Sequence, residues 1–147
     1  MAERHQLVKC SPDQVWRILA SGDSYARWVV GTQRILSVDA AWPAVGAELC
    51  FQAGVGPLRI TDSCVVRISE AEHRLELEAK ADPFGTARIA FTLSPWSSHT
   101  LVTLDEHALL GPGARLQGAV SERLLHMRNR RLLDNLARVA VTDRPSP

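Results

Sequence analysis

The chain is poor in the residues that form covalent or metal-bound frameworks. It has three cysteines among 147 residues, Cys10, Cys50 and Cys64, with no C-x-x-C spacing. An odd number at these separations indicates neither a disulfide framework nor a zinc knuckle, and reduced, buried thiols are expected. The five histidines show no H-x-x-x-H or H-E-x-x-H spacing, so no metal site is predicted. No G-x-S-x-G, Walker or Rossmann motif is present, and no cofactor is expected.

The chain also lacks a strong charge and a long apolar run. It carries 17 basic and 16 acidic side chains, a formal net charge of +1. No overall field therefore attracts it to nucleic acid, and no nucleic-acid partner is predicted. The first ten residues contain no signal-peptide-like apolar stretch, and nowhere do about 18 apolar residues follow one another. A cytoplasmic protein without a membrane span is expected.

Length and composition are those of one ordinary globular domain. Hydrophobic residues make up 46% of the chain and charged residues 22%, a balance typical of folded proteins. No internal repeat or linker divides the sequence, so residues 1–141 are predicted to form a single domain. The remaining segment, T-D-R-P-S-P, contains two prolines and no apolar anchor. Residues 142–147 are therefore expected to be a flexible tail.

Two short helices are predicted near the N-terminus, after a short strand at residues 5–9. Ser11, Pro12 and Gln14 supply an N-cap, a proline at the first helical position and an amide three residues past the cap. Apolar residues then recur at helical spacing from Val15 until Gly22 ends the helix. A second short helical turn is expected over residues 24–28.

From residue 33 onward the apolar pattern changes to the two-residue period of strands. Short runs rich in Ile, Val, Leu and Phe alternate with turns that contain Gly, Pro, Asp or Ser. These connections are short enough for antiparallel neighbours. Alternation places Asp62 and Ile68 on the same face as Cys64 and Val66, so one side of the sheet is expected to be covered. Strands are predicted near residues 33–39, 47–53, 58–69, 73–81, 86–94 and 100–109.

The covering element is a long C-terminal helix, predicted from residue 118 to residue 140. Leu125, Leu132 and Leu136 repeat at the spacing of one helical face. A helix of this length extends about 35 Å, which is enough to cross a sheet. The predicted fold class is α+β, with a curved antiparallel sheet around this helix and an apolar pocket between them.

Six short motifs carry a resemblance to a known family. They are S-P-D-Q-V-W at 11–16, S-Y-A-R-W at 24–28, V-G at 45–46, G-P-L-R at 56–59, D-E-H-A-L-L-G-P at 105–112 and R-N-R-R-L-L at 128–133. Across residues 7–140 the chain resembles the START-like or SRPBCC superfamily, in particular its bacterial polyketide cyclase/dehydrase-like branch. The resemblance implies a helix-grip fold, in which a seven-stranded antiparallel sheet bends around the C-terminal helix, with two short helices between the first two strands. It also implies an internal cavity for lipids, sterols, polyketides or other apolar molecules, but no particular reaction.

Two carboxylates interrupt apolar strand faces and are candidates for the polar part of the pocket. Asp62 is expected to face inward, where an unbonded carboxylate is unfavourable. The alternatives are a β-bulge that turns it outward and a structural bond to neighbouring backbone. Glu106 shares its side with Val102 and Leu104, although the other side of that strand also carries leucines. The helix-grip order places Asp62 and Glu106 three strands apart, or about 14 Å, so an acid/base pair is not predicted.

The remaining cavity candidates are apolar residues and one amide. Trp28 follows the second short helix and is expected at the pocket wall or mouth. Phe91 lies on the apolar face of its strand, and Leu125 and Leu132 lie on that of the long helix. Asn129 points to the same side, where it is expected either to bond a ligand oxygen or to hold a strand or a buried water.

The leading functional hypothesis is a carrier or sensor that binds an apolar or amphipathic small molecule. The first alternative is a polyketide aromatase/cyclase or dehydratase in which Asp62, Glu106 or His107 moves protons, so enzymatic activity stays open. The second is a protein-interaction module that uses the basic side of the long helix, although a solvated surface also explains that charge. Arg128, at the edge of the covered face, is suited to a salt bridge as well as to a ligand contact. The oligomeric state is left open between monomer and homodimer.

Overall fold

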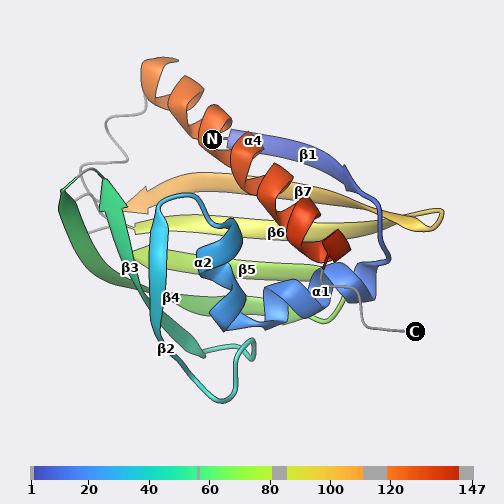
Figure 1. Cartoon of the computed structure of the whole chain (residues 1–147), viewed down its shortest axis with the longest axis horizontal. Helices are drawn as coiled ribbons and strands as arrows, with labels where there is room; N and C mark the ends of the chain where they lie inside the picture. Colours follow the sequence, from blue (N-terminus) through green and yellow to red (C-terminus); the bar gives the residue numbers. More distant parts are fainter. Residues whose placement is uncertain (1, 56, 81–85, 111–118, 143–147) are drawn as a thin grey trace.

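A computed structural model describes residues 2–55, 57–80, 86–110 and 119–142. Side chains are described for these residues except 2, 55, 58, 107–110 and 119–126. Within this part of the chain, seven strands form one antiparallel sheet in the order β1-β7-β6-β5-β4-β3-β2 (Figure 1). The strands are β1 (Ala2–Val8), β2 (Thr32–Val38), β3 (Glu48–Val55), β4 (Leu58–Glu70), β5 (Arg74–Lys80), β6 (Thr86–Trp96) and β7 (His99–Leu110).

Between β1 and β2 the chain forms helix α1 (Pro12–Ala20), the short 3-10 helix η1 (Gly22–Ser24) and helix α2 (Tyr25–Trp28). Helix α1 begins as predicted, because the Ser11 N–H donates to Gln14 Oε1 over 3.4 Å and a proline occupies the first helical position. At Gly22 an added Cβ would lie 2.7 Å from Val38 Cγ1, so only glycine allows η1 to approach β2 this closely.

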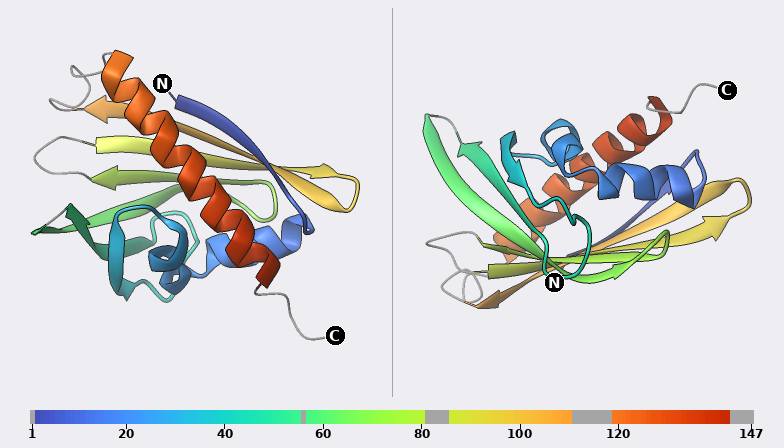
Figure 2. Two further views of the ribbon diagram at one scale, coloured as in Figure 1. Left: turned by 45° about the horizontal axis from the view of Figure 1, so that its top comes forward. Right: turned by 90° about the horizontal axis from the view of Figure 1, so that it is seen from below.

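The described helices lie on one face of the sheet, which curves toward them (Figures 1 and 2). The long helix α4 (Ala119–Thr142) crosses this concave face and packs against β1, α1 and α2. An antiparallel meander runs from β2 to β7, and β1 closes the sheet by pairing with β7. The predicted seven-stranded sheet, long C-terminal helix and two short helices between the first two strands are therefore confirmed.

The predicted face of β4 is wrong beyond Val66. In the pairing of β4 with β5, Val66 opposes Leu77. The next partners are Ile68 and Glu76, so Arg67 is an extra residue in a β-bulge. The bulge shifts the two-residue alternation, and Ile68 joins the outer face instead of the apolar inner face. An extra residue of this kind has no counterpart in the apolar pattern, because alternation assumes an unbroken ladder.

The buried side of α4 consists of residues at helical spacing, none more than 6% exposed: Leu132, Leu133, Leu136 and Ala140. Leu132 and Leu136 thus occupy the buried face that the sequence predicts, whereas the side chain of Leu125 lies outside the described residues. The helix also runs two residues past its predicted end, to Thr142, whose hydroxyl bonds a carbonyl oxygen one turn earlier. Thr142, expected in the tail, is therefore helical, and residues 143–147 lie outside the described part of the chain.

The packing of α4 predicts that substitutions on its buried and exposed sides change the free energy of unfolding by very different amounts. Leu136 is fully buried, whereas Arg130 is exposed. Leu136→Ala is expected to lower the free energy of unfolding by about 2–5 kcal/mol, because truncation leaves an unfilled space in the core. Arg130→Ala is the control and is expected to change it by no more than about 0.5 kcal/mol. Chemical denaturation of both variants measures the difference, and equal effects would contradict this packing.

Candidate functional site

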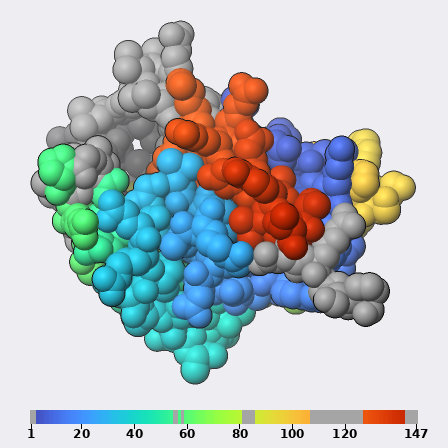
Figure 3. All heavy atoms as spheres, viewed as in Figure 1, coloured from blue at the N-terminus to red at the C-terminus, as the bar shows by residue number. Residues whose placement is uncertain are grey.

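A pocket of about 520 Å³ lies between the concave face of the sheet and the helices α2 and α4. Strands β3 to β6 supply its floor, and β7 contributes Glu106. Trp28 of α2 and the Arg128 and Leu132 side chains of α4 form its roof. Figure 3 shows α4 and the segment from α1 to β2 side by side over this face of the molecule. Most of the lining side chains are apolar.

The pocket exists because small side chains face one another across the sheet. Ala79 of β5 pairs with Ala87 of β6 on one side and with Cys64 of β4 on the other, and all three line the pocket. Four residues further along β5 and β6, the paired positions hold the large, almost fully buried side chains of Leu75 and Phe91, and Leu104 of β7 pairs with Phe91. Phe91 also lines the pocket and bounds it on this side. The two alanines therefore leave open the volume that larger residues occupy in a close-packed interior.

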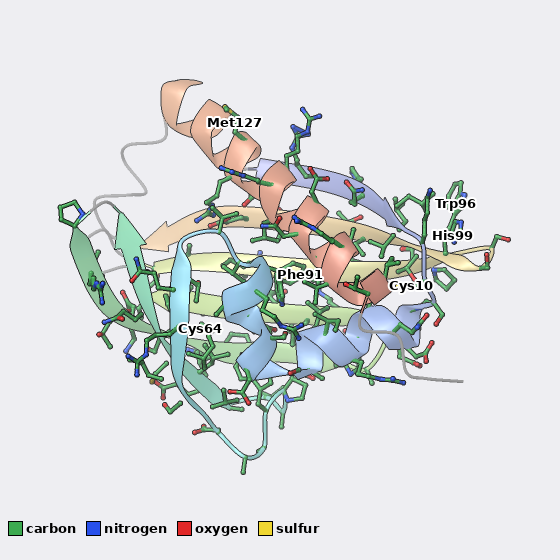
Figure 4. The ribbon with its side chains drawn as sticks, in the orientation of Figure 1. Cys10, Cys64, Phe91, Trp96, His99 and Met127 are labelled. Atoms are coloured by element: carbon green, nitrogen blue, oxygen red, sulfur yellow. The ribbon has the colours of Figure 1, made fainter. Side chains whose placement is uncertain are left out.

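The aromatic side chains of the roof direct their polar atoms into the protein rather than the pocket. Trp28 is 1% exposed, and its Nε1 donates to Ser24 Oγ over 3.1 Å. Its ring and that of Phe91, which is labelled in Figure 4, make a T-shaped contact with 5.7 Å between ring centroids. The Tyr25 hydroxyl donates to the Leu19 carbonyl oxygen over 2.7 Å. Because these polar atoms are satisfied internally, the roof offers a ligand mainly apolar surface.

Burial keeps two weakly acidic groups of the pocket wall protonated. It raises the pKa of the Tyr25 hydroxyl well above its usual 10.0. Burial also raises the pKa of the Cys64 thiol from 9.0 to about 12, with a further contribution from the neighbouring thiol of Cys50. Since the thiolate is the nucleophilic form of cysteine, Cys64 is a poor nucleophile near neutral pH.

Asp62 lies on the pocket side of β4 and lines the pocket. It pairs with Phe51 of β3, in a stretch where the register of β3 and β4 is regular, so no bulge turns it outward there. Its Oδ1 accepts the Ser63 N–H over 2.9 Å. Two alternatives to a role in the pocket were set out from the sequence for Asp62. The first, a β-bulge that turns it outward, is absent from this pairing of β3 and β4, whereas the second, a bond to neighbouring backbone, is present.

Glu106 and Arg128 form an ion pair that links β7 to α4 at the pocket wall. Arg128 Nη2 donates to Glu106 Oε1, and Glu106 is only 6% exposed. Glu106 lies on the inner face of its strand together with Val102 and Leu104, which are completely buried. Arg128 therefore makes the salt bridge that its position on the helix suggested and also lines the pocket.

Asn129 is completely buried but is not part of the pocket lining. Arg128 and Leu132, one turn apart, lie on the pocket flank of α4, and the next residue after Arg128 is rotated by about 100° around the helix. Asn129 Oδ1 accepts a hydrogen bond from Arg128 Nη2 over 3.4 Å. Asn129 is thus outside the lining and bonded to Arg128, and its contact with a ligand stays a prediction.

The other predicted site residues divide into two groups. Trp28, Phe91 and Leu132 line the pocket, whereas the side chains of Leu125 and His107 lie outside the described residues. The apolar pattern does not single out Ala79 and Ala87, although they create the space. The feature that marks them is that two small side chains are paired on neighbouring strands. This pairing can be recognised only when the strand register is known.

Four of the described residues that line the pocket carry a charged side chain: Asp62, Lys80, Glu106 and Arg128. Among the residues whose positions are described, no group of three or more His, Cys, Asp or Glu side chains is placed to hold a metal ion. In the same part of the chain, no helix combines the length and the apolarity needed to cross a membrane.

Comparison with known families agrees with this architecture. The family model described as "Polyketide cyclase / dehydrase and lipid transport" matches residues 2–141. The chain belongs to this family. Membership in the polyketide cyclase/dehydrase and lipid transport family confirms the resemblance carried by the sequence motifs. No curated protein sequence matches the chain.

Solved structures share the fold of this family member at low sequence identity. DynU16, from the dynemicin biosynthetic locus, is 19% identical with a TM-score of 0.71; the match covers 98% of this chain but only 48% of DynU16. NE0264 from Nitrosomonas europaea is 21% identical with a TM-score of 0.73, over 96% of this chain and 94% of its own. Ara h 8.0201 is 7% identical with a TM-score of 0.75, over 96% and 97%. At these identities the likeness establishes the helix-grip fold alone.

The rate at which the Cys64 thiol is alkylated tests whether the pocket wall is buried. Iodoacetamide at pH 8 is expected to alkylate Cys64 at least about tenfold more slowly in the folded chain than in urea, because burial raises the pKa from 9.0 to about 12 and the thiolate is the reactive form. Mass spectrometry of the peptide that contains Cys64 measures both rates. Similar rates in the folded and unfolded chain would show that this wall is not buried as described.

Proposed function

We propose that the chain binds one apolar or amphipathic small molecule in this pocket, as a carrier or sensor. The observation that carries the proposal is a pocket of about 520 Å³ with a mainly apolar lining. Small-molecule sites usually have volumes of about 300–1,000 Å³. The lipid transport named in the family description agrees with a ligand of this kind.

The chemical groups of the pocket favour binding over catalysis. A general base needs an acceptor that can reach a substrate proton. Glu106 Oε1 accepts a hydrogen bond from Arg128, and Asp62 Oδ1 accepts one from the Ser63 backbone. Burial holds the Cys64 thiol in its protonated form near neutral pH. Because the lining is mainly apolar, we infer binding in preference to cyclisation or dehydration.

Filling the pocket should remove the ligand site without unfolding the chain. N-phenyl-1-naphthylamine, a neutral fluorescent probe, is expected to bind the parent protein with a 1:1 stoichiometry. Ala79→Phe places a ring in the space between β5 and the helices. It is expected to weaken the affinity for the probe by about tenfold or more, equivalent to about 1.4 kcal/mol. Fluorescence titration measures both affinities.

Ala44→Phe is the matched control, because it introduces the same side chain at an exposed turn outside the pocket. Its affinity for the probe is expected to equal that of the parent. Circular dichroism establishes that both variants are folded. Equal probe binding by the parent and by folded Ala79→Phe would mean that the pocket is not the binding site.

A further inference from the structure

The polar groups at the α4 side of the pocket have an excess of hydrogen-bond donors. Within the described part of the chain, the Arg128 guanidinium makes two hydrogen bonds, one to Glu106 and one to Asn129, and both use Nη2. Arg128 Nε is buried, and among the described residues it has no hydrogen-bond partner. The same holds for Asn129 Nδ2. Buried donors without acceptors are uncommon in native proteins. Asn129 lies outside the pocket lining, whereas Arg128 is part of it, so an acceptor on a ligand can reach only the guanidinium.

The accessible part of this cluster is the guanidinium head. The Arg128 side chain is 41% exposed and lines the pocket, whereas the Glu106 side chain is 8% exposed. Arginine has five N–H donors in a fixed plane, and a single nitrogen carries both bonds that Arg128 makes. Arg128 therefore retains donors for a ligand while it keeps its bond to Glu106.

Charge determines which kind of acceptor fits. Glu106 already balances the charge of Arg128, and Asp62 places a second carboxylate on the pocket wall. Among the lining residues that the structure describes, the other positive group is Lys80, which is exposed at the end of β5. A carboxylate ligand beside Arg128 would add an unbalanced charge to a mainly apolar space, which is unfavourable. A neutral carbonyl oxygen accepts the same hydrogen bond without that penalty.

We propose that Arg128, held in place by Glu106 and Asn129, is the polar anchor of the pocket and selects neutral ligands that carry a carbonyl oxygen, such as ketones or esters. The apolar body of the ligand lies over Ala79 and Ala87, and its carbonyl oxygen accepts a hydrogen bond from the guanidinium. This specificity rests on the proposed binding function, and it narrows the ligand class from apolar molecules in general to neutral carbonyl compounds.

Three naphthalenes of similar shape test the specificity by displacement of N-phenyl-1-naphthylamine. They are 2-acetylnaphthalene, with a neutral carbonyl, 2-isopropylnaphthalene, with no oxygen, and 2-naphthoate, with a charged carboxylate. In the parent protein at pH 7.5 the ketone is expected to bind about tenfold more tightly than the hydrocarbon, the effect of one hydrogen bond to a charged donor. The carboxylate is expected to bind more weakly than the ketone.

A double variant removes the anchor without leaving an unpaired charge. Glu106→Leu with Arg128→Met replaces the ion pair by apolar side chains, a change that buried pairs often tolerate. Its affinity for the ketone is expected to fall to about that for the hydrocarbon, while hydrocarbon binding persists. Arg130→Met, on the exposed side of the same helix, is the control and should keep the preference of the parent.

The outcomes separate the two proposals. If neither the fluorescent probe nor any naphthalene binds the parent, the proposed binding function is wrong. If the probe binds but the ketone and the hydrocarbon bind the parent equally, the binding function stands and the carbonyl anchor is wrong. A parent that prefers 2-naphthoate, or a folded double variant that keeps the ketone preference, would also overturn the inference.

Discussion

The packing of α4 across the concave face of the sheet is the constraint on which the rest of the structure depends. Leu133, Leu136 and Ala140 are almost completely buried along its C-terminal half, which packs near β1 and α1. Arg128 and Leu132 of the same helix line a space that the sheet leaves unfilled. The helix therefore contributes to both the core and the pocket wall, and the burial of its core side chains holds the pocket-lining residues in place.

Two polar contacts connect the same helix to other elements that surround the pocket. Its Asn135 Nδ2 donates to the Trp28 carbonyl oxygen over 3.4 Å, which ties the end of α2 to the roof. The ion pair between Arg128 and Glu106 ties α4 to β7 at the pocket wall. Truncation of one member of such a pair would leave the other charge without its partner, whereas replacement of both by apolar groups is often tolerated. The two contacts thus connect α4 to α2 and to β7 beside the pocket.

Much of the fold follows from periodicity, because the spacing of Leu132 and Leu136 and the alternation of the strands reflect which faces are buried. The pocket was less predictable. A β-bulge at Arg67 shifts the alternation without any change in the apolar pattern. The space itself depends on Ala79 and Ala87 meeting across two strands, which requires the register. Asn129 and Arg128 are adjacent in sequence, but only Arg128 lines the pocket. Each residue is rotated by about 100° around the helix from the one before it. The apolar spacing of the sequence is too coarse to show which of two adjacent residues faces the pocket.

Native mass spectrometry of the chain purified from its own host tests the central claim, that the pocket between α4 and the sheet holds a small molecule. The account predicts a folded species whose mass exceeds that of the chain by one small molecule, with loss of that mass on denaturation. The Ala79→Phe variant from the same host should lack the additional mass. A bound molecule that is equally abundant in the parent and in folded Ala79→Phe would contradict the account.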